Sequence, residues 1–215
     1  MSTPPSGTST PRLALDLVTL VGLVAALVYI AGWSYAERYF AHFQVGLLAL
    51  EVPAEYYFVY GSWVLGHWWW LVLLGVILGW LGLGLVPPAA WRTRWLRALA
   101  LLLILALFLG LRWLGGTTGS QDYRAQQATD FGASPRVRVW LKPNSTPPVP
   151  EDASLTDLTT ALPQGCQRLL VQNRSTLWLF RPRQGAPQTQ VAVLALPMAE
   201  VRALRLLPQF TSCEE

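Results

Sequence analysis

The sequence predicts an α-helical membrane protein with three transmembrane helices, followed by a small α+β, mostly antiparallel domain outside the cytoplasm. Of its 215 residues, 53% are hydrophobic and only 13% are charged, whereas soluble domains carry about 25% charged residues. Long apolar runs fill the stretch from 13 to 114, and side chains of alternating character follow it. Such a composition excludes a simple soluble enzyme, a disordered regulator and a small disulfide-stapled secreted module.

Three apolar runs are long enough to cross a bilayer, which takes about 20 apolar residues per helix. They cover residues 13–33, 56–86 and 96–114. The second run is longer than one crossing but too short for two, since two crossings alone need about 40 residues. The first run exceeds the roughly 7 to 15 residues of a secretory signal, so we expect a retained anchor. A polar tail at 1–12 precedes it and is expected to be disordered in the cytoplasm.

The arginines predict the orientation, because short cytoplasmic loops carry an excess of positive charge. The loop between the second and third runs holds Arg92 and Arg94, and the amino-terminal tail ends at Arg12. The segment 34–55 has one arginine against three glutamates. We therefore expect a multi-pass protein of a bacterial inner membrane, with its amino terminus cytoplasmic and its carboxy-terminal domain periplasmic.

The segment 34–55 is expected to lie at the membrane interface. Tyr35, Tyr39 and Phe43 recur every four residues, which predicts that the first helix continues as an aromatic interfacial segment. A short apolar patch at 47–50 follows. This patch either docks at the interface within the same protein, which we favour, or contacts a partner.

Small residues in the runs predict close helix packing. Gly75, Gly79 and Gly82 share one face of the second predicted span, and this spacing lets helix backbones approach in lipid. This face could pack against another span of the same chain or against a partner subunit, and the sequence favours neither. Gly22 and Ala26 form a weaker version of the pattern in the first span and are its candidate internal mate.

Glu51, Glu55 and His67 are the candidate interaction residues. His67 lies within the second run, and an ionisable group inside a membrane is by default a functional hypothesis. Tryptophans at 68–70 follow it and are typical of an interfacial belt, so we favour an ordinary interfacial histidine. Several copies of the chain could still arrange these side chains as rings at the mouth of a channel.

After residue 114 the sequence predicts a linker at 115–133, with a short helix at 121–130, and the α+β domain at 134–215. A helix is expected at 154–162, opened by a capping box, and a hairpin turn at 173–175. Strands are expected at 136–142, 168–172, 176–180, 190–196 and 203–207. The two cysteines, Cys166 and Cys213, could form one disulfide in an oxidising compartment.

The domain contains no pattern that indicates catalysis. Both histidines, His42 and His67, precede it, which excludes His-based triads and most zinc sites there. Its basic residues are scattered, so nucleic-acid binding is not expected. The sequence thus predicts no catalytic residue, no metal site and no cofactor, and we do not expect an enzyme.

The expected partners are the lipid bilayer and either another membrane protein or further copies of the chain. The leading hypothesis is an anchored binding or accessory subunit that acts through its extracytoplasmic domain and its transmembrane helices. The alternative is a homo-oligomeric membrane sensor or channel. An intramembrane enzyme is disfavoured, because the spans lack paired polar groups.

Overall fold

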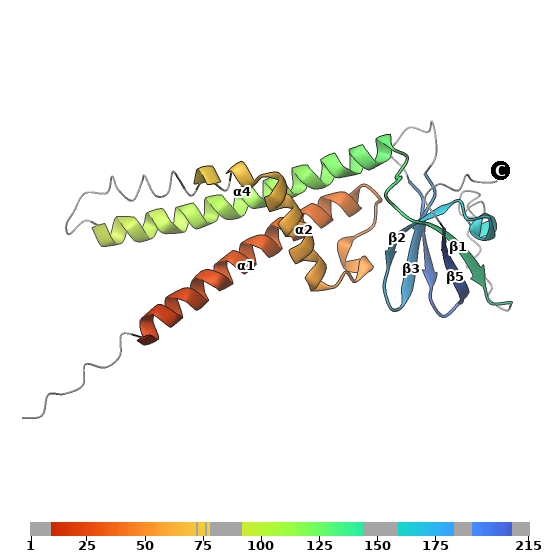
Figure 1. The fold of residues 1–215 in the computed structure, drawn as a ribbon, viewed down its shortest axis with the longest axis horizontal. Coiled ribbons are helices and arrows are strands. Elements are labelled where there is room, and N and C mark those ends of the chain that lie inside the picture. Colours follow the sequence, from red (N-terminus) through yellow and green to blue (C-terminus); the bar gives the residue numbers. More distant parts are fainter. Residues whose placement is uncertain are drawn as a thin grey trace, which may run out of the picture. The chain divides into compact units, whose positions relative to one another are not determined.

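The structure is a computed structural model that forms two compact units (Figure 1). The residues that it describes are 10–71, 73–75, 77, 92–143, 159–182 and 191–207. The first unit comprises residues 1–35 and 54–116, and the second comprises 36–53 and 117–215. The long helices are α1 (Thr10–Ala41), α2 (Ala54–His67) and α4 (Arg92–Ala128).

Two helices among the described residues are long and apolar enough to cross a membrane. They are Leu17–Ala41 within α1 and Leu101–Ala128 within α4, which overlap the first and third predicted spans. The second predicted span begins as α2, and residues 69–71, 73–75 and 77 are also helical. Its remaining part lies outside the described residues, so a third crossing stays a prediction.

Glycines bring α1 and α2 together in the first unit. A Cβ atom on Gly32 would lie 1.7 Å from the carbonyl oxygen of Tyr57, and one on Gly61 would lie 2.1 Å from that of Val28. Aromatic rings surround this crossing, with the Trp33 and Tyr57 centroids 5.1 Å apart. The two backbones therefore pack more closely than any larger side chain would permit.

The variant Gly61→Ala is expected to weaken this crossing by about 1 to 3 kcal/mol, because the new methyl group overlaps backbone of α1. Gly66→Ala is the matched control in the same helix, since a Cβ there meets nothing within 4 Å. The control should be neutral or slightly stabilising. The midpoint temperature of unfolding in detergent micelles measures both effects, and equal midpoints for the two variants would contradict the close crossing.

Residues 115–128, for which the sequence predicts a linker with a short helix, are instead the last turns of α4. The physical reason is again helix packing. A Cβ atom on Gly115 would lie 2.3 Å from the carbonyl oxygen of Ala31 and 3.1 Å from the Cβ of Ser34. Gly115 and Gly119 are four residues apart, the spacing that allows close helix contact. Tertiary packing thus overrides the low helix propensity of glycine.

The second unit contains a five-stranded antiparallel sheet with the strand order β4-β3-β2-β1-β5. The strands are β1 (Arg136–Leu141), β2 (Gln167–Gln172), β3 (Thr176–Phe180), β4 (Val193–Pro197) and β5 (Val201–Leu207). All five predicted strands are confirmed, with small shifts at their ends.

Most of the helix predicted at 154–162 lies outside the described residues. Residues 159–160 are helical, and a 3-10 helix, η2 (Leu162–Gln164), follows.

The predicted β2–β3 hairpin is also confirmed, and Asn173 explains its turn. Its side-chain oxygen accepts hydrogen bonds from the backbone N–H groups of Ser175, at 2.9 Å, and Thr176, at 2.5 Å. Asparagine commonly stabilises turns in this way.

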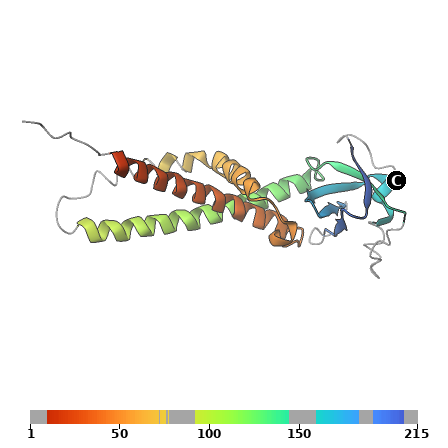
Figure 2. The same cartoon turned by 90° about the horizontal axis from the view of Figure 1, so that it is seen from below.

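The sheet curls around an apolar core. A turn at 198–200 joins β4 directly to β5, both of which are blue in Figures 1 and 2. In the strand order these two strands are nevertheless the opposite edges of the sheet. The sheet must therefore bend until the end of β4 meets the start of β5. The buried core residues come from several strands and from η2; they are Val137, Val139, Leu162, Leu177, Leu179, Leu194 and Leu196.

Candidate functional site

A cluster of aromatic side chains in the second unit joins the ends of α1 and α4 to the sheet. Phe43, Tyr123, Phe131 and Phe180 are buried together, and Tyr39 packs against them. The Phe43 ring centroid lies 5.0 Å from that of Phe180 and 5.2 Å from that of Tyr123. We call these five residues the aromatic clamp. Such ring pairs contribute roughly 0.5 to 1.5 kcal/mol each beyond their buried area.

Polar side chains make further contacts at the edge of the aromatic clamp. The Tyr39 hydroxyl donates a hydrogen bond of 2.6 Å to the side-chain oxygen of Gln126, which ties α1 to α4. His42 stacks on the Tyr123 ring at a centroid distance of 4.3 Å. Partial burial lowers the pKa of His42, and the positive charges of Arg124 and Arg38 lower it further. The lowered pKa favours the neutral form of His42, which suits a stacked position.

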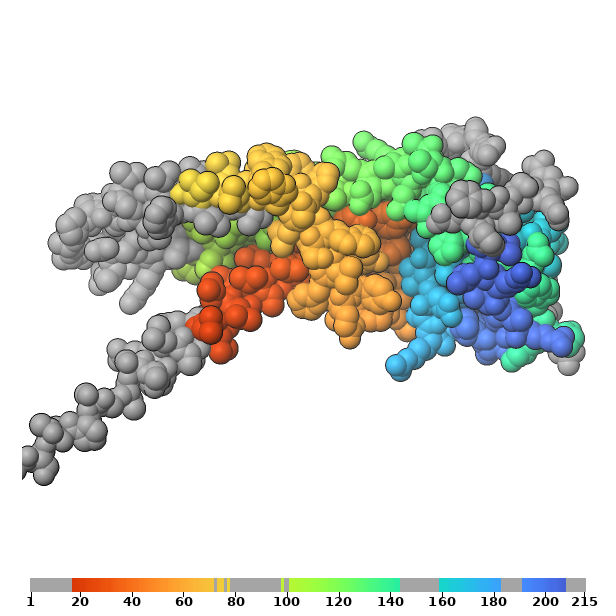
Figure 3. Space-filling view, viewed as in Figure 1, coloured from red at the N-terminus to blue at the C-terminus, as the bar shows by residue number. Residues whose placement is uncertain are grey.

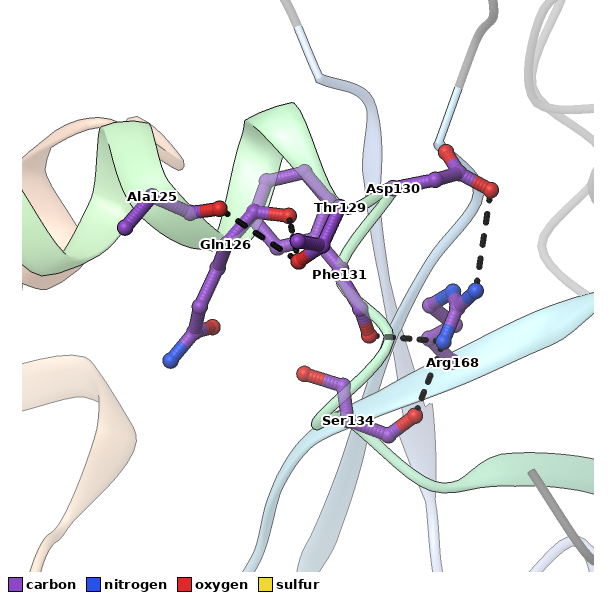
Figure 4. A network of polar contacts seen from close by, with 7 residues as sticks. All are labelled: Ala125, Gln126, Thr129, Asp130, Phe131, Ser134 and Arg168. Atoms are coloured by element: carbon purple, nitrogen blue, oxygen red, sulfur yellow. Dashed lines mark hydrogen bonds and ion pairs between the residues drawn. The ribbon is translucent and has the colours of Figure 1, made fainter.

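Arg168 secures the chain where it leaves α4 and enters the sheet (Figure 4). Its guanidinium is buried and donates hydrogen bonds to the carbonyl oxygens of Phe131, at 2.6 Å, and Ser134, at 3.0 Å. It also lies 3.6 Å from a carboxylate oxygen of Asp130. Burial lowers the pKa of Arg168, but the nearby Asp130 carboxylate raises it, and an arginine remains charged in this setting. The charge is thus paired and satisfied inside the protein.

The backbone held by Arg168 is unusual. Asp130 and Phe131 adopt left-handed conformations with φ angles of 52° and 54°, which are costly for residues other than glycine. Before them, the Thr129 hydroxyl donates hydrogen bonds to the carbonyl oxygens of Gln126, at 3.0 Å, and Ala125, at 3.3 Å, in the last turn of α4 (Figure 4). The turn therefore depends on Arg168 to offset its strain.

The apolar patch at 47–50 packs within the second unit, of which it is a part, and its expected place at the membrane interface stays a prediction. The patch forms a 3-10 helix, η1 (Leu47–Leu50), in which Leu47 and Leu50 are buried. Asn173 donates hydrogen bonds to the Leu50 carbonyl, at 3.3 Å, and to a Glu51 carboxylate oxygen, at 3.4 Å. Leu48 points away and is 81% exposed.

Of the three predicted interaction residues, Glu51 belongs to the second unit, and Glu55 and His67 belong to the first. Glu51 follows η1 in the second unit with a left-handed backbone. Glu55 lies in the first turn of α2 and His67 in its last turn, about 18 Å apart at the rise of an α-helix. His67 is exposed, and its ring lies edge-on to that of Trp68 at 5.3 Å. Glu55 and His67 therefore do not share one site within a single chain.

The predicted packing glycines are placed only in part. Gly75 is helical, and a Cβ there would meet nothing within 4 Å, while Gly79 and Gly82 lie outside the described residues. The same open space surrounds Gly22. Packing through the Gly75 face stays a prediction, whereas the close contacts in the structure use other glycines, Gly32, Gly61 and Gly115.

Cys166 is buried and disulfide-bonded. Cys213 lies outside the described residues, so the pairing of these two cysteines stays a prediction. Among the described residues, no three His, Cys, Asp or Glu side chains gather closely enough to hold a metal ion.

Comparisons with known protein families, curated proteins and solved structures find no match to this chain.

Proposed function

We propose that the chain is a bacterial inner-membrane protein with three spans, which serves as an anchored binding or accessory subunit. Its amino terminus lies in the cytoplasm and its sheet domain in the periplasm. The aromatic clamp carries this proposal, because it builds the last turns of both candidate spanning helices into the domain. The last turns of these two helices are thus part of the folded domain, and no flexible linker separates them from it. Such a direct connection would hold the domain at the membrane surface, where it could bind a partner.

The exposed side chains of the two candidate spanning helices support membrane insertion. A helix that is apolar on its exposed sides is typical of a lipid environment. Large apolar side chains exposed along α1 and α4 include Leu17, Val18, Leu20, Val21, Leu101, Leu102, Leu103, Leu105 and Leu109. Arg112 in α4 is compatible with this setting, since arginines near the ends of spans extend toward the interface.

Cysteine labelling in cells tests the orientation. Arg174→Cys places a thiol on the exposed β2–β3 turn, and Ser6→Cys places one in the amino-terminal tail. A membrane-impermeant maleimide should label the first variant in intact spheroplasts and the second only after permeabilisation. The reverse pattern would contradict the proposed topology.

In the unmodified chain, the two native cysteines should react with the maleimide only after reduction, because a periplasmic disulfide protects them.

A second candidate function, the homo-oligomeric sensor or channel, is favoured by the open face at Gly75. Because a Cβ there meets nothing within 4 Å, Gly75→Leu should leave the fold of one chain intact. If copies pack through this face, the variant should dissociate the oligomer. His67→Leu should then also abolish conductance in reconstituted vesicles, whereas an accessory subunit should tolerate the change.

A further inference from the structure

The curled sheet has an open seam between its two edge strands. Among the described strands, β4 pairs only with β3, and β5 pairs only with β1. The turn at 198–200 holds one end of the seam together, but β4 and β5 are not hydrogen-bonded to each other. Within the part of the chain that the structure describes, one side of β5 therefore carries backbone groups without a strand partner, which is a template for an added strand. Residues 191–207 reach the surface in blue in Figure 3.

The core-facing side of β5 is incompletely covered. Leu206 lies opposite Val137 of β1, on the same face of the sheet. Val137 is fully buried, whereas Leu206 is 56% exposed. An apolar side chain that belongs to the core face but remains open to solvent marks a place where one more strand would extend the core.

The opposite side of β5 carries positive charge. Arg205 lies directly opposite Arg138 of β1, and like charges in this position destabilise a strand pair. Arg138 donates a hydrogen bond to the Gln164 carbonyl at 3.4 Å, and its Nε is buried without a hydrogen-bond partner among the described residues. Arg202 and Arg205 are exposed and make no ion pair with the part of the chain that the structure describes. Among the described residues, these two arginines thus lack a negative counterpart.

We propose that β5 binds an extended segment of a partner polypeptide as an additional strand. The segment carries acidic side chains on the Arg205 side and apolar side chains on the Leu206 side, because successive residues of a strand face opposite ways. Backbone hydrogen bonds provide the affinity and the alternating side chains the specificity. A second β5 is a poor occupant, since β5 carries Arg202 and Arg205 and no acidic residue to face them. This inference rests on the proposed accessory function and gives the chemistry of its partner.

The test uses the full chain in detergent micelles and two synthetic peptides, one alternating glutamate with valine and one alternating lysine with valine. The glutamate peptide should bind in a fluorescence anisotropy titration and should slow amide hydrogen exchange at 201–207. The lysine peptide should do neither. Arg205→Glu should shift the preference toward the lysine peptide by about fivefold to tenfold, as expected for reversing a cross-strand charge pair.

Arg174→Glu is the matched control, because it reverses a charge on the exposed β2–β3 turn. It should keep the wild-type preference. The proposal is overturned if neither peptide protects 201–207, if both bind equally well, or if these amides are already protected without peptide because this chain or a second copy covers them. Peptide binding is measured on the isolated chain, whereas the accessory role is tested by the composition of the native assembly, so a failure of one claim can be told from a failure of the other.

Discussion

Arg168→Met is expected to destabilise the second unit by about 2 to 4 kcal/mol, because it removes a buried charge whose partners stay behind. The carbonyl oxygens of Phe131 and Ser134 lose their donor, and Asp130 loses its counter-charge. The left-handed turn that these bonds hold then becomes free to relax. Amide hydrogen exchange at 167–180 should accelerate accordingly.

Two further variants make this result specific. Arg174→Met removes an exposed arginine from the β2–β3 turn and should change the free energy of unfolding by less than about 0.5 kcal/mol. Arg168→Lys keeps the charge but loses the forked geometry of the guanidinium, so its loss should be intermediate. If the Arg168→Met and Arg174→Met chains were equally stable, the stabilising role of the Arg168 hydrogen bonds and of its ion pair with Asp130 would be contradicted.

Phe43→Ala is expected to cost about 3 to 5 kcal/mol, since it empties the centre of the aromatic clamp. Phe43 contacts Tyr123, Phe131 and Phe180, and it is almost fully buried. The measurement is the rate of limited proteolysis within 117–207, which should rise sharply. Leu48→Ala is the matched control in the same segment because Leu48 is exposed, and it should remain near wild type. If Phe43 only touched lipid headgroups, the two variants would behave alike.

Strands and the main apolar helices could be predicted from the sequence because their signals are local. The alternation around Val137 and Val139 gives the correct buried face of β1, and Asn173 marks the hairpin. The aromatic spacing of Tyr39 and Phe43 correctly indicates that the first helix extends past its apolar run. In each case, neighbouring residues carry the information.

The aromatic clamp could not be predicted, because it depends on contacts between distant residues. The spacing of Phe43 is equally typical of a membrane interface and of a buried face. Nothing beside Arg168 in the sequence indicates a buried charge, since its partners lie more than thirty residues earlier. One signal was available: Gly115 and Gly119 have the spacing of close helix contacts, but the polar residues between them favour a linker in isolation.

Native mass spectrometry of the protein, purified in mild detergent from its own membrane, tests the central claim most directly. An anchored accessory subunit should appear in a species whose mass requires other polypeptides besides the 23.9 kDa chain. In that assembly, Arg205→Glu should reduce the occupancy of the partner, whereas Arg174→Glu should not. A single species at a whole-number multiple of 23.9 kDa would contradict the accessory role and favour a self-assembled sensor or channel.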